Sequence, residues 1–215
     1  MSRVRVKICG VRTLEEAEAA IEAGADALGF NFWPRSPRYI APADAQEITR
    51  RLSPLVTLIG VFVNEKRERI VEIAAPVGLQ AIQLHGDEPP AFCEGFDSLR
   101  VIKALRVGEA FDCRAIEPYA VHMILLDTSI KGSYGGTGQR FDWQVAIEAK
   151  RYAPVMLAGG LRIENVAAAI TTVRPAAIDV CSGIEAAPGR KDLHMLREFM
   201  LEVARANALV ASQID

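Results

Sequence analysis

Hydrophobic residues in this chain gather in short β-rich runs, separated by longer segments with helical spacing. In the first run, Val4, Val6 and Ile8 share one face of a strand, and the intervening residues up to Cys9 share the other. The run ends at Gly10. Similar runs predict further strands, and the full set is 4–8, 27–32, 57–63, 80–84, 100–105, 123–127, 155–158 and 177–180.

Strands that alternate with helical segments predict an α/β fold with a parallel sheet. Eight such units in 215 residues predict a closed (β/α)8 TIM barrel of eight parallel strands, forming a single domain over 1–215. A doubly wound open sheet is the alternative. It lacks support because Cys9-Gly10-Val11-Arg12 follows the first strand, where that fold has G-x-G-x-x-G.

The helix boundaries carry signals of their own. Thr13 and Glu16 have the spacing of a capping box, and Gly24 is placed to end the helix that they begin. Asn64 and Asp87 are predicted to cap the helices after the third and fourth strands. The fifth connection is weakly patterned and predicts only one or two helical turns.

Composition narrows the class of protein. The formal net charge of -2 and the pI near 6.0 argue against a nucleic acid or an anionic membrane as partner. No apolar span reaches membrane length and no apolar signal core follows Met1, so we expect a cytoplasmic protein. Four cysteines without a C-x-x-C pair predict reduced thiols, and three histidines without ligand spacing predict no metal site.

The active face of a (β/α)8 barrel is built from the carboxyl ends of its strands, so polar residues there are candidates for chemistry. Cys9 ends the first strand and Asp127 ends the sixth, which places a base and an acid across the barrel mouth from each other. The structural alternatives are a small core thiol for Cys9 and a turn-capping carboxylate for Asp127.

Glycines in three connections predict a phosphate site. Barrels commonly hold phosphate with backbone N–H groups after the seventh and eighth strands, where this chain has Gly159-Gly160 and Ser182-Gly183. The 14-residue, glycine-rich segment 128–141 is long for a compact domain, and we expect it to close over a ligand. Its Gly136, Thr137 and Gly138 would add further donors.

The positively charged residues near the predicted mouth can have either a structural or a functional role. Arg38 lies in a Pro-flanked loop, where it is either solvated or free to bind a carboxylate in bidentate fashion. Lys7 shares the inward face of the first strand with Cys9, so it needs a buried partner, for which Asp179 is the candidate. His85 ends the fourth strand, and a structural role for it outweighs a catalytic one.

Seven strings of this chain, in order, resemble the phosphoribosylanthranilate isomerase family of tryptophan biosynthesis. They are VKICGVRTLEEA, GFNFWPRSPRYI, GVFVN, IQLHGDE, LLDTSIKGSYGGTGQRFDW, LAGGL and DVCSGIE. One position departs from the family, which usually has Ser-Ser-Gly where this chain has Cys181-Ser182-Gly183.

The resemblance implies an isomerase that carries out an Amadori rearrangement on a small phosphorylated substrate. It implies Cys9 as general base, Asp127 as general acid, and Arg38 at the anthranilate carboxylate. It also implies substrate contacts for Asp179, and we group His85 and Lys7 with that site. The glycines above, with Thr137 and Ser182, would hold the phosphate. No cofactor is expected, because the substrate's own amine serves as electron sink, and we expect a monomer or a weak homodimer.

Two other functions fit the residues less well. A Schiff-base aldolase would use Lys103 or Lys7 as a desolvated amine. A catalytically silent phosphate-binding barrel is possible too, but it has no need for both a thiol and a carboxyl at the mouth.

Overall fold

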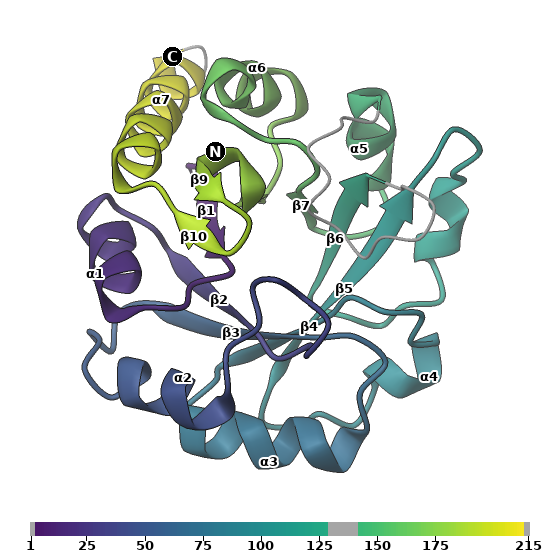
Figure 1. The fold of residues 1–215 in the computed structure, drawn as a ribbon. Helices are drawn as coiled ribbons and strands as arrows, with labels where there is room; N and C mark the ends of the chain where they lie inside the picture. Colours follow the sequence, from purple (N-terminus) through teal and green to yellow (C-terminus); the bar gives the residue numbers. More distant parts are fainter. Residues whose placement is uncertain (1–2, 129–141, 213–215) are drawn as a thin grey trace.

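The computed structural model, which describes residues 3–128 and 142–212, contains a closed barrel of eight parallel strands in sequence order. Figure 1 looks into this ring, with the helices arranged around its outside. The predicted (β/α)8 architecture is confirmed. The strands are β1 (Arg5–Cys9), β2 (Ala27–Asn31), β3 (Thr57–Phe62), β4 (Ala81–Leu84), β5 (Arg100–Val107), β6 (Met123–Thr128), β7 (Val155–Leu157) and β8 (Ala177–Val180).

Seven helices cover the barrel in the part of the chain that is described: α1 (Leu14–Glu22), α2 (Pro42–Thr49), α3 (Arg67–Val77), α4 (Pro90–Cys93), α5 (Trp143–Ala149), α6 (Ile163–Val173) and α7 (Leu193–Ser212). The fifth connection holds only the short 3-10 helix η1 (Cys113–Ile116), as its weak pattern predicts. Within the same residues, no helix has the length and apolar character needed to cross a membrane.

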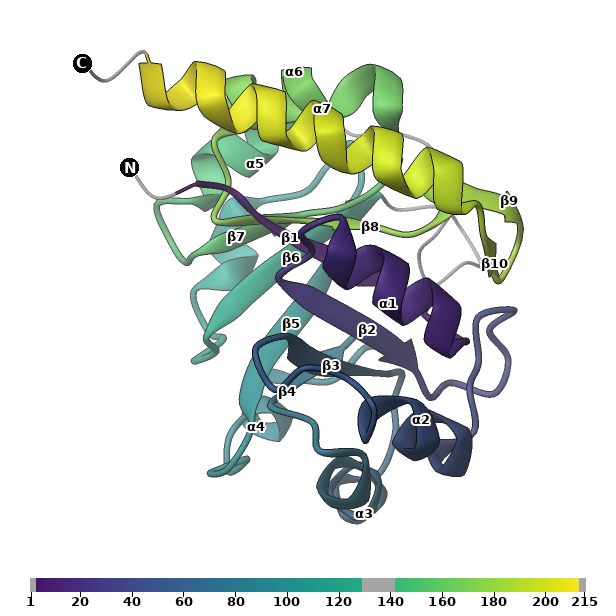
Figure 2. The same ribbon diagram turned by 90° about the vertical axis from the view of Figure 1, so that its left-hand side faces the viewer.

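A small hairpin after β8 was not predicted. The 3-10 helix η2 (Ser182–Ile184) leads into β9 (Glu185–Ala187), which pairs antiparallel with β10 (Arg190–Lys191). Figure 2 shows this hairpin at the end of the barrel opposite the two chain ends. The hairpin therefore lies on the side where the strands end, beside the predicted active face.

Two hydrophobic layers stabilise the fold. The outer layer, between strands and helices, includes Val4, Val6 and Ile8, and the inner layer fills the barrel. The inner residues are Ala27, Ile59, Ala81, Ile102, Ala104, Leu125, Met156, Ala158 and Ala177. The period-2 assignment of β1 is thus confirmed, because its apolar face packs outward and Lys7 and Cys9 occupy the other face.

The helix-cap predictions are only partly right. The Thr13 hydroxyl accepts from the Glu16 amide at 3.2 Å, but the Glu16 carboxylate accepts from the amides of Arg12 (2.8 Å) and Lys191 (2.9 Å), so the capping box is incomplete. Asn64 does not cap α3. Its side-chain oxygen accepts from the Asp87 amide at 2.7 Å, and α3 begins after Lys66 without a side-chain cap.

Asp87 does not cap a helix either. Helix α4 begins after Pro89 without a side-chain cap, and the Asp87 carboxylate pairs with Arg106 instead. In both failed predictions a tertiary contact replaces the helix cap: Asn64 contacts the loop after β4, and Asp87 pairs with Arg106 on β5.

Helix α7 packs against α1 and α6 and covers the seam where β8 meets β1. Replacing the fully buried Phe199 with alanine is expected to lower the free energy of unfolding by about 3–5 kcal/mol, through lost burial and an unfilled cavity. Leu201→Ala, on the exposed side of the same helix, should change it by less than about 0.5 kcal/mol. Denaturant titration of both variants checks the difference, and equal losses would contradict the described packing.

Candidate active site

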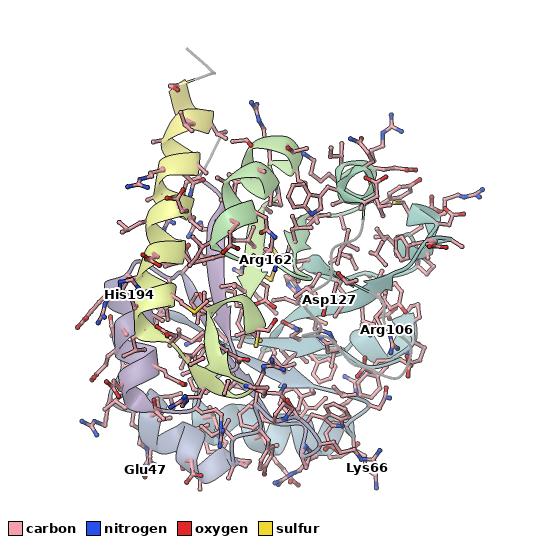
Figure 3. The ribbon with its side chains drawn as sticks, turned by 45° about the horizontal axis from the view of Figure 1, so that its top comes forward. Glu47, Lys66, Arg106, Asp127, Arg162 and His194 are labelled. Atoms are coloured by element: carbon pink, nitrogen blue, oxygen red, sulfur yellow. The ribbon has the colours of Figure 1, made fainter. Side chains whose placement is uncertain are left out.

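A cavity opens at the carboxyl ends of the strands and collects five of the six predicted catalytic and substrate-binding residues, all except Lys7. Figure 3 shows Asp127 near the middle of the molecule, on the ring of strands. The cavity brings together side chains from six strands and from the connections that follow four of them. Its lining is Cys9, Asn31, Trp33, Ser36, Arg38, Val61, Val63, Gln83, His85, Asp127, Asp179 and Cys181.

Cys9 lies above a buried ion pair. Lys7 and Asp179 occupy paired positions on β1 and β8, and Lys7 Nζ donates to Asp179 Oδ1 at 2.9 Å. The predicted partner of Lys7 is therefore confirmed. Lys7 does not line the cavity and is 1% exposed, so its charge acts on Cys9 from the layer of side chains beneath the cavity.

The charges around this pair set the ionisation of the thiol. A hydrogen bond shared with Cys181 lowers the pKa of Cys9 well below its usual value; burial opposes this shift, and the Lys7 ammonium adds to it. Burial and the charge of Cys9 raise the pKa of Asp179 to about 6, although Lys7 acts in the opposite direction. The site thus favours a thiolate at Cys9.

Asp127 is held from two sides. Its Oδ1 accepts from the Thr128 amide at 2.8 Å, and its Oδ2 lies 3.4 Å from His85 Nε2. The Gln83 amide nitrogen lies 2.7 Å from His85 Nδ1. Because an amide nitrogen can only donate, this contact leaves the proton of a neutral imidazole on Nε2, facing Asp127.

Arg38 reaches the cavity but is already paired. Its Nε and one terminal nitrogen donate to the two oxygens of Glu185 at 2.9 and 2.8 Å. Lys191, whose side chain is fully buried, lies 3.2 Å from Glu185 Oε1 and donates to the Cys181 carbonyl at 3.2 Å. Hydrogen bonds from Arg38 and the charge of Lys191 lower the pKa of Glu185, against the effect of burial.

Ser182 and Gly183 line a second hollow beside the mouth, together with Arg162, Glu164, Asn165 and Met195. Gly183 is required there, because an added Cβ would lie 1.9 Å from the Leu161 carbonyl oxygen. Gly159 has a φ of +80°, and a Cβ there would lie 2.4 Å from Thr128 Oγ1. These turns bring the connections after β7 and β8 together at the first turn of α6, as the phosphate prediction requires.

Gly160 belongs to the same turn, and its carbonyl accepts from Asn165 Nδ2 at 2.8 Å. The predicted contributions of Gly136, Thr137 and Gly138, and the rest of the segment to Phe141, lie outside the described residues.

Two lysines considered as Schiff-base amines are fully engaged. Lys103 donates to the carbonyls of Leu84 and Gly86 at 3.2 and 2.8 Å and to Glu88 at 2.7 Å, which uses all three of its protons. Lys7 is committed to Asp179, and the net effect of its surroundings raises its pKa. The raised pKa of Lys7 is the opposite of what an amine nucleophile needs, and the Lys103 ammonium is held in a buried ion pair with Glu88.

Three site residues were missed from the sequence: Gln83 lines the cavity, whereas Glu185 and Lys191 contact its lining residues Arg38 and Cys181. Gln83 alternates with Ala81 and His85 on β4, so the period-2 pattern could have placed it inside the barrel. Glu185 and Lys191 come from the β9–β10 hairpin, and nothing in the local pattern identifies them. Asn64 and Arg106 end strands as well, but their contacts lie in the loop around Asp87, away from the cavity.

The family model described as N-(5'-phosphoribosyl)anthranilate (PRA) isomerase matches residues 6–202. A relative from Citrifermentans bemidjiense, named N-(5'-phosphoribosyl)anthranilate isomerase, is 48% identical over 201 residues, covering 94% of this chain and 97% of its own. A relative of the same name from Thermotoga maritima is 47% identical over 199 residues, with 92% and 97% covered.

Solved structures agree with this result. The phosphoribosylanthranilate isomerase of Thermotoga maritima has a TM-score of 0.86 at 44% identity, covering 94% of this chain and 99% of the other. A phosphoribosylanthranilate isomerase in complex with reduced 1-(o-carboxyphenylamino)-1-deoxyribulose 5-phosphate has a TM-score of 0.83 at 43% identity, with the same coverage. The chain therefore belongs to the N-(5'-phosphoribosyl)anthranilate isomerase family.

Proposed function

We propose that Cys9 is the general base and Asp127 the general acid with which this chain converts N-(5-phospho-β-D-ribosyl)anthranilate into 1-(2-carboxyphenylamino)-1-deoxy-D-ribulose 5-phosphate. The reaction is that of the family, an aldose–ketose isomerisation in tryptophan biosynthesis. The assignment of the two roles rests on one observation. A thiol beside a buried ammonium and a carboxyl on the sixth strand line the same cavity.

The steps follow from these two groups. A protonated Asp127 gives its proton to the ribose ring oxygen, so the C1–O bond breaks and the nitrogen lone pair forms a protonated Schiff base. This iminium makes the C2 proton acidic. The Cys9 thiolate removes that proton, and the electron pair moves towards the nitrogen to give an enolamine, which tautomerises to the ketose. The positive nitrogen accepts the electrons, so no cofactor takes part in this sequence.

Other side chains would orient the substrate. Arg38 is proposed to bind the anthranilate carboxylate. Because the Arg38 guanidinium already pairs with Glu185, the substrate carboxylate would either share the guanidinium with Glu185 or displace Glu185 from it. Asp179 lines the cavity beside Cys9, and His85 contacts Asp127, so both are proposed to position substrate and catalytic groups. Lys7 is proposed to act from below, through Asp179 and through its charge at Cys9.

The phosphate is proposed to lie where the connections after β7 and β8 meet. Gly159, Gly160, Ser182 and Gly183 leave their backbone unobstructed there, close to the first turn of α6. Gly136, Thr137 and Gly138 are proposed to complete this site.

The protein is further proposed to be a cytoplasmic monomer or a weak homodimer, although the phosphoribosylanthranilate isomerase of Thermotoga maritima is described as dimeric. Among the described residues, the large exposed hydrophobic side chains are Leu55, Val71, Leu201 and Leu209, which come from three separate segments. A permanent dimer normally buries a larger contiguous apolar surface.

Cys9→Ala and Asp127→Asn are each expected to lower kcat by roughly 10²- to 10⁴-fold with little change in substrate binding, because each removes a proton-transfer group. Loss of phosphoribosylanthranilate fluorescence measures turnover. Cys113→Ala and Asp97→Asn, which lie outside the cavity, serve as matched controls. Unimpaired turnover in either catalytic variant would remove that residue from the mechanism.

Arg38→Ala is expected to raise KM by roughly 10- to 100-fold and to change kcat less, since a bidentate contact to a carboxylate is lost. Arg35→Ala, an exposed arginine in the same loop, is the control and should leave KM unchanged. The carboxylate assignment fails if the two variants have the same KM.

A base that is a thiolate at rest should react with iodoacetamide at unusually low pH. Because the pKa of Cys9 is lowered, the rate of its alkylation should reach half its maximum at a lower pH than that of cysteine in a short peptide. Mass spectrometry of the tryptic peptide 8–12 measures how much of Cys9 is alkylated at each pH. Cys93 is the internal comparison, since burial raises its pKa to about 11. A midpoint for Cys9 at or above that of the peptide contradicts the thiolate.

A further inference from the structure

We propose that Cys9 and Cys181 form a thiol pair that hydroperoxides oxidise to a disulfide, which switches the isomerase off until a dithiol reduces it. The loss of activity rests on the proposed role of Cys9, whereas the formation of the disulfide does not. Cys181 stands where the family usually has serine, so this pair is a property of this chain.

The strand register places the two cysteines side by side. Lys7 pairs with Asp179 and Ile8 with Val180 along the β1–β8 ladder, so Cys9 and Cys181 are the next neighbours. The Lys7 and Asp179 side chains meet inside the barrel, and side chains two residues further along point the same way. Neighbouring strands lie about 4.8 Å apart, within the roughly 4.4–6.8 Å between Cα atoms that a disulfide spans.

The contacts of the two sulfur atoms agree with the register. The thiols share a hydrogen bond, and both line the same cavity. A Cβ added to Gly10, the residue after Cys9, would lie 3.2 Å from Cys181 Sγ. The two sulfur atoms are therefore close to each other at the ends of adjacent strands. The cavity admits a molecule as small as hydrogen peroxide to both of them.

The surrounding charges divide the roles between the two thiols. Lys191 Nζ and Glu185 Oε1, which lie 3.2 Å from each other, are each 3.7 Å from Cys181 Sγ. The hydrogen bond from Cys181 and the Lys7 charge favour the thiolate at Cys9, whereas the same hydrogen bond raises the pKa of Cys181. Cys9 is thus the thiol that attacks an oxidant, and Cys181 is the thiol that resolves the product.

The chemistry balances in two steps. The Cys9 thiolate attacks one oxygen of hydrogen peroxide, so an S–O bond forms, the O–O bond breaks, and hydroxide leaves. Cys181 then attacks the sulfur of the Cys9 sulfenic acid, so the S–S bond forms and the S–O bond breaks. Its thiol proton and the departing hydroxide make water. In total, two thiols and one peroxide give one disulfide and two waters.

The remaining two cysteines lie apart from this pair. Cys93 Sγ contacts the Pro89 carbonyl at 3.7 Å, and Cys113 Sγ contacts the Val145 carbonyl at 3.5 Å. Both are buried in the outer layer, and burial raises the pKa of each thiol. They are therefore expected to resist mild oxidation, which makes Cys113→Ser a suitable control.

The test treats the full, freshly reduced chain with a small excess of hydrogen peroxide and follows mass and activity together. The expected result is a loss of two hydrogens, a cross-link between tryptic peptides 8–12 and 163–190, and a roughly tenfold or greater fall in turnover that dithiothreitol reverses. Cys113→Ser should behave in the same way as the unmodified chain. Cys181→Ser should form no cross-link, and its Cys9 should gain two oxygen atoms irreversibly.

Three other outcomes would each contradict a part of the proposal. If peroxide converts Cys9 of the unmodified chain to a sulfinate while Cys181 stays a free thiol, the proposed disulfide is wrong. The proposed role of Cys9 as general base is not affected by that result. A complete cross-link with full turnover overturns the switch and also the catalytic role of Cys9. Equal, dithiothreitol-reversible inactivation in Cys181→Ser assigns the effect to another residue.

Discussion

The buried ion pair between Lys7 and Asp179 is the interaction on which the site depends. Placing an ammonium at 1% exposure inside a barrel costs several kcal/mol unless a close partner offsets it. Asp179, 2.9 Å from Lys7 Nζ, is that partner. Gly29 on β2 leaves room for the Lys7 side chain, since a Cβ at Gly29 would lie 2.9 Å from Lys7 Cε. Removing either charge alone would leave the other uncompensated, at a cost of roughly 3–5 kcal/mol.

Charge balance at this side of the mouth acts in the same direction as the Cys181 hydrogen bond, which lowers the pKa of Cys9 most. Three cations, Lys7, Arg38 and Lys191, face two carboxylates, Asp179 and Glu185, in direct contacts. The imbalance favours one further negative charge, and Cys9 is the group placed to carry it. Asp127 has no direct contact with these five groups and lies beside His85 instead.

Much of this arrangement follows from local sequence patterns, and the rest depends on tertiary contacts. Alternation identifies the strands, and a parallel barrel brings strand ends such as Cys9, His85 and Asp127 to one mouth. The cap predictions for Asn64 and Asp87 failed because a neighbouring loop competes for their side chains. Glu185 and Lys191 enter through a short hairpin whose position is set by packing, including the bond from the Lys191 amide to Glu16.

Lys7 and Asp179 are 172 residues apart in sequence, and the thiol of β1 acquires Asp179, Cys181 and Lys191 as neighbours only from the last third of the chain. A chain that is still being synthesised can form several βα units while Cys9 has neither Asp179 nor Lys191 nearby. The hydrogen bond from Cys181, which lowers the pKa of Cys9 most, cannot form in such a chain. The lowered pKa of Cys9 thus depends on closure of the ring between β1 and β8.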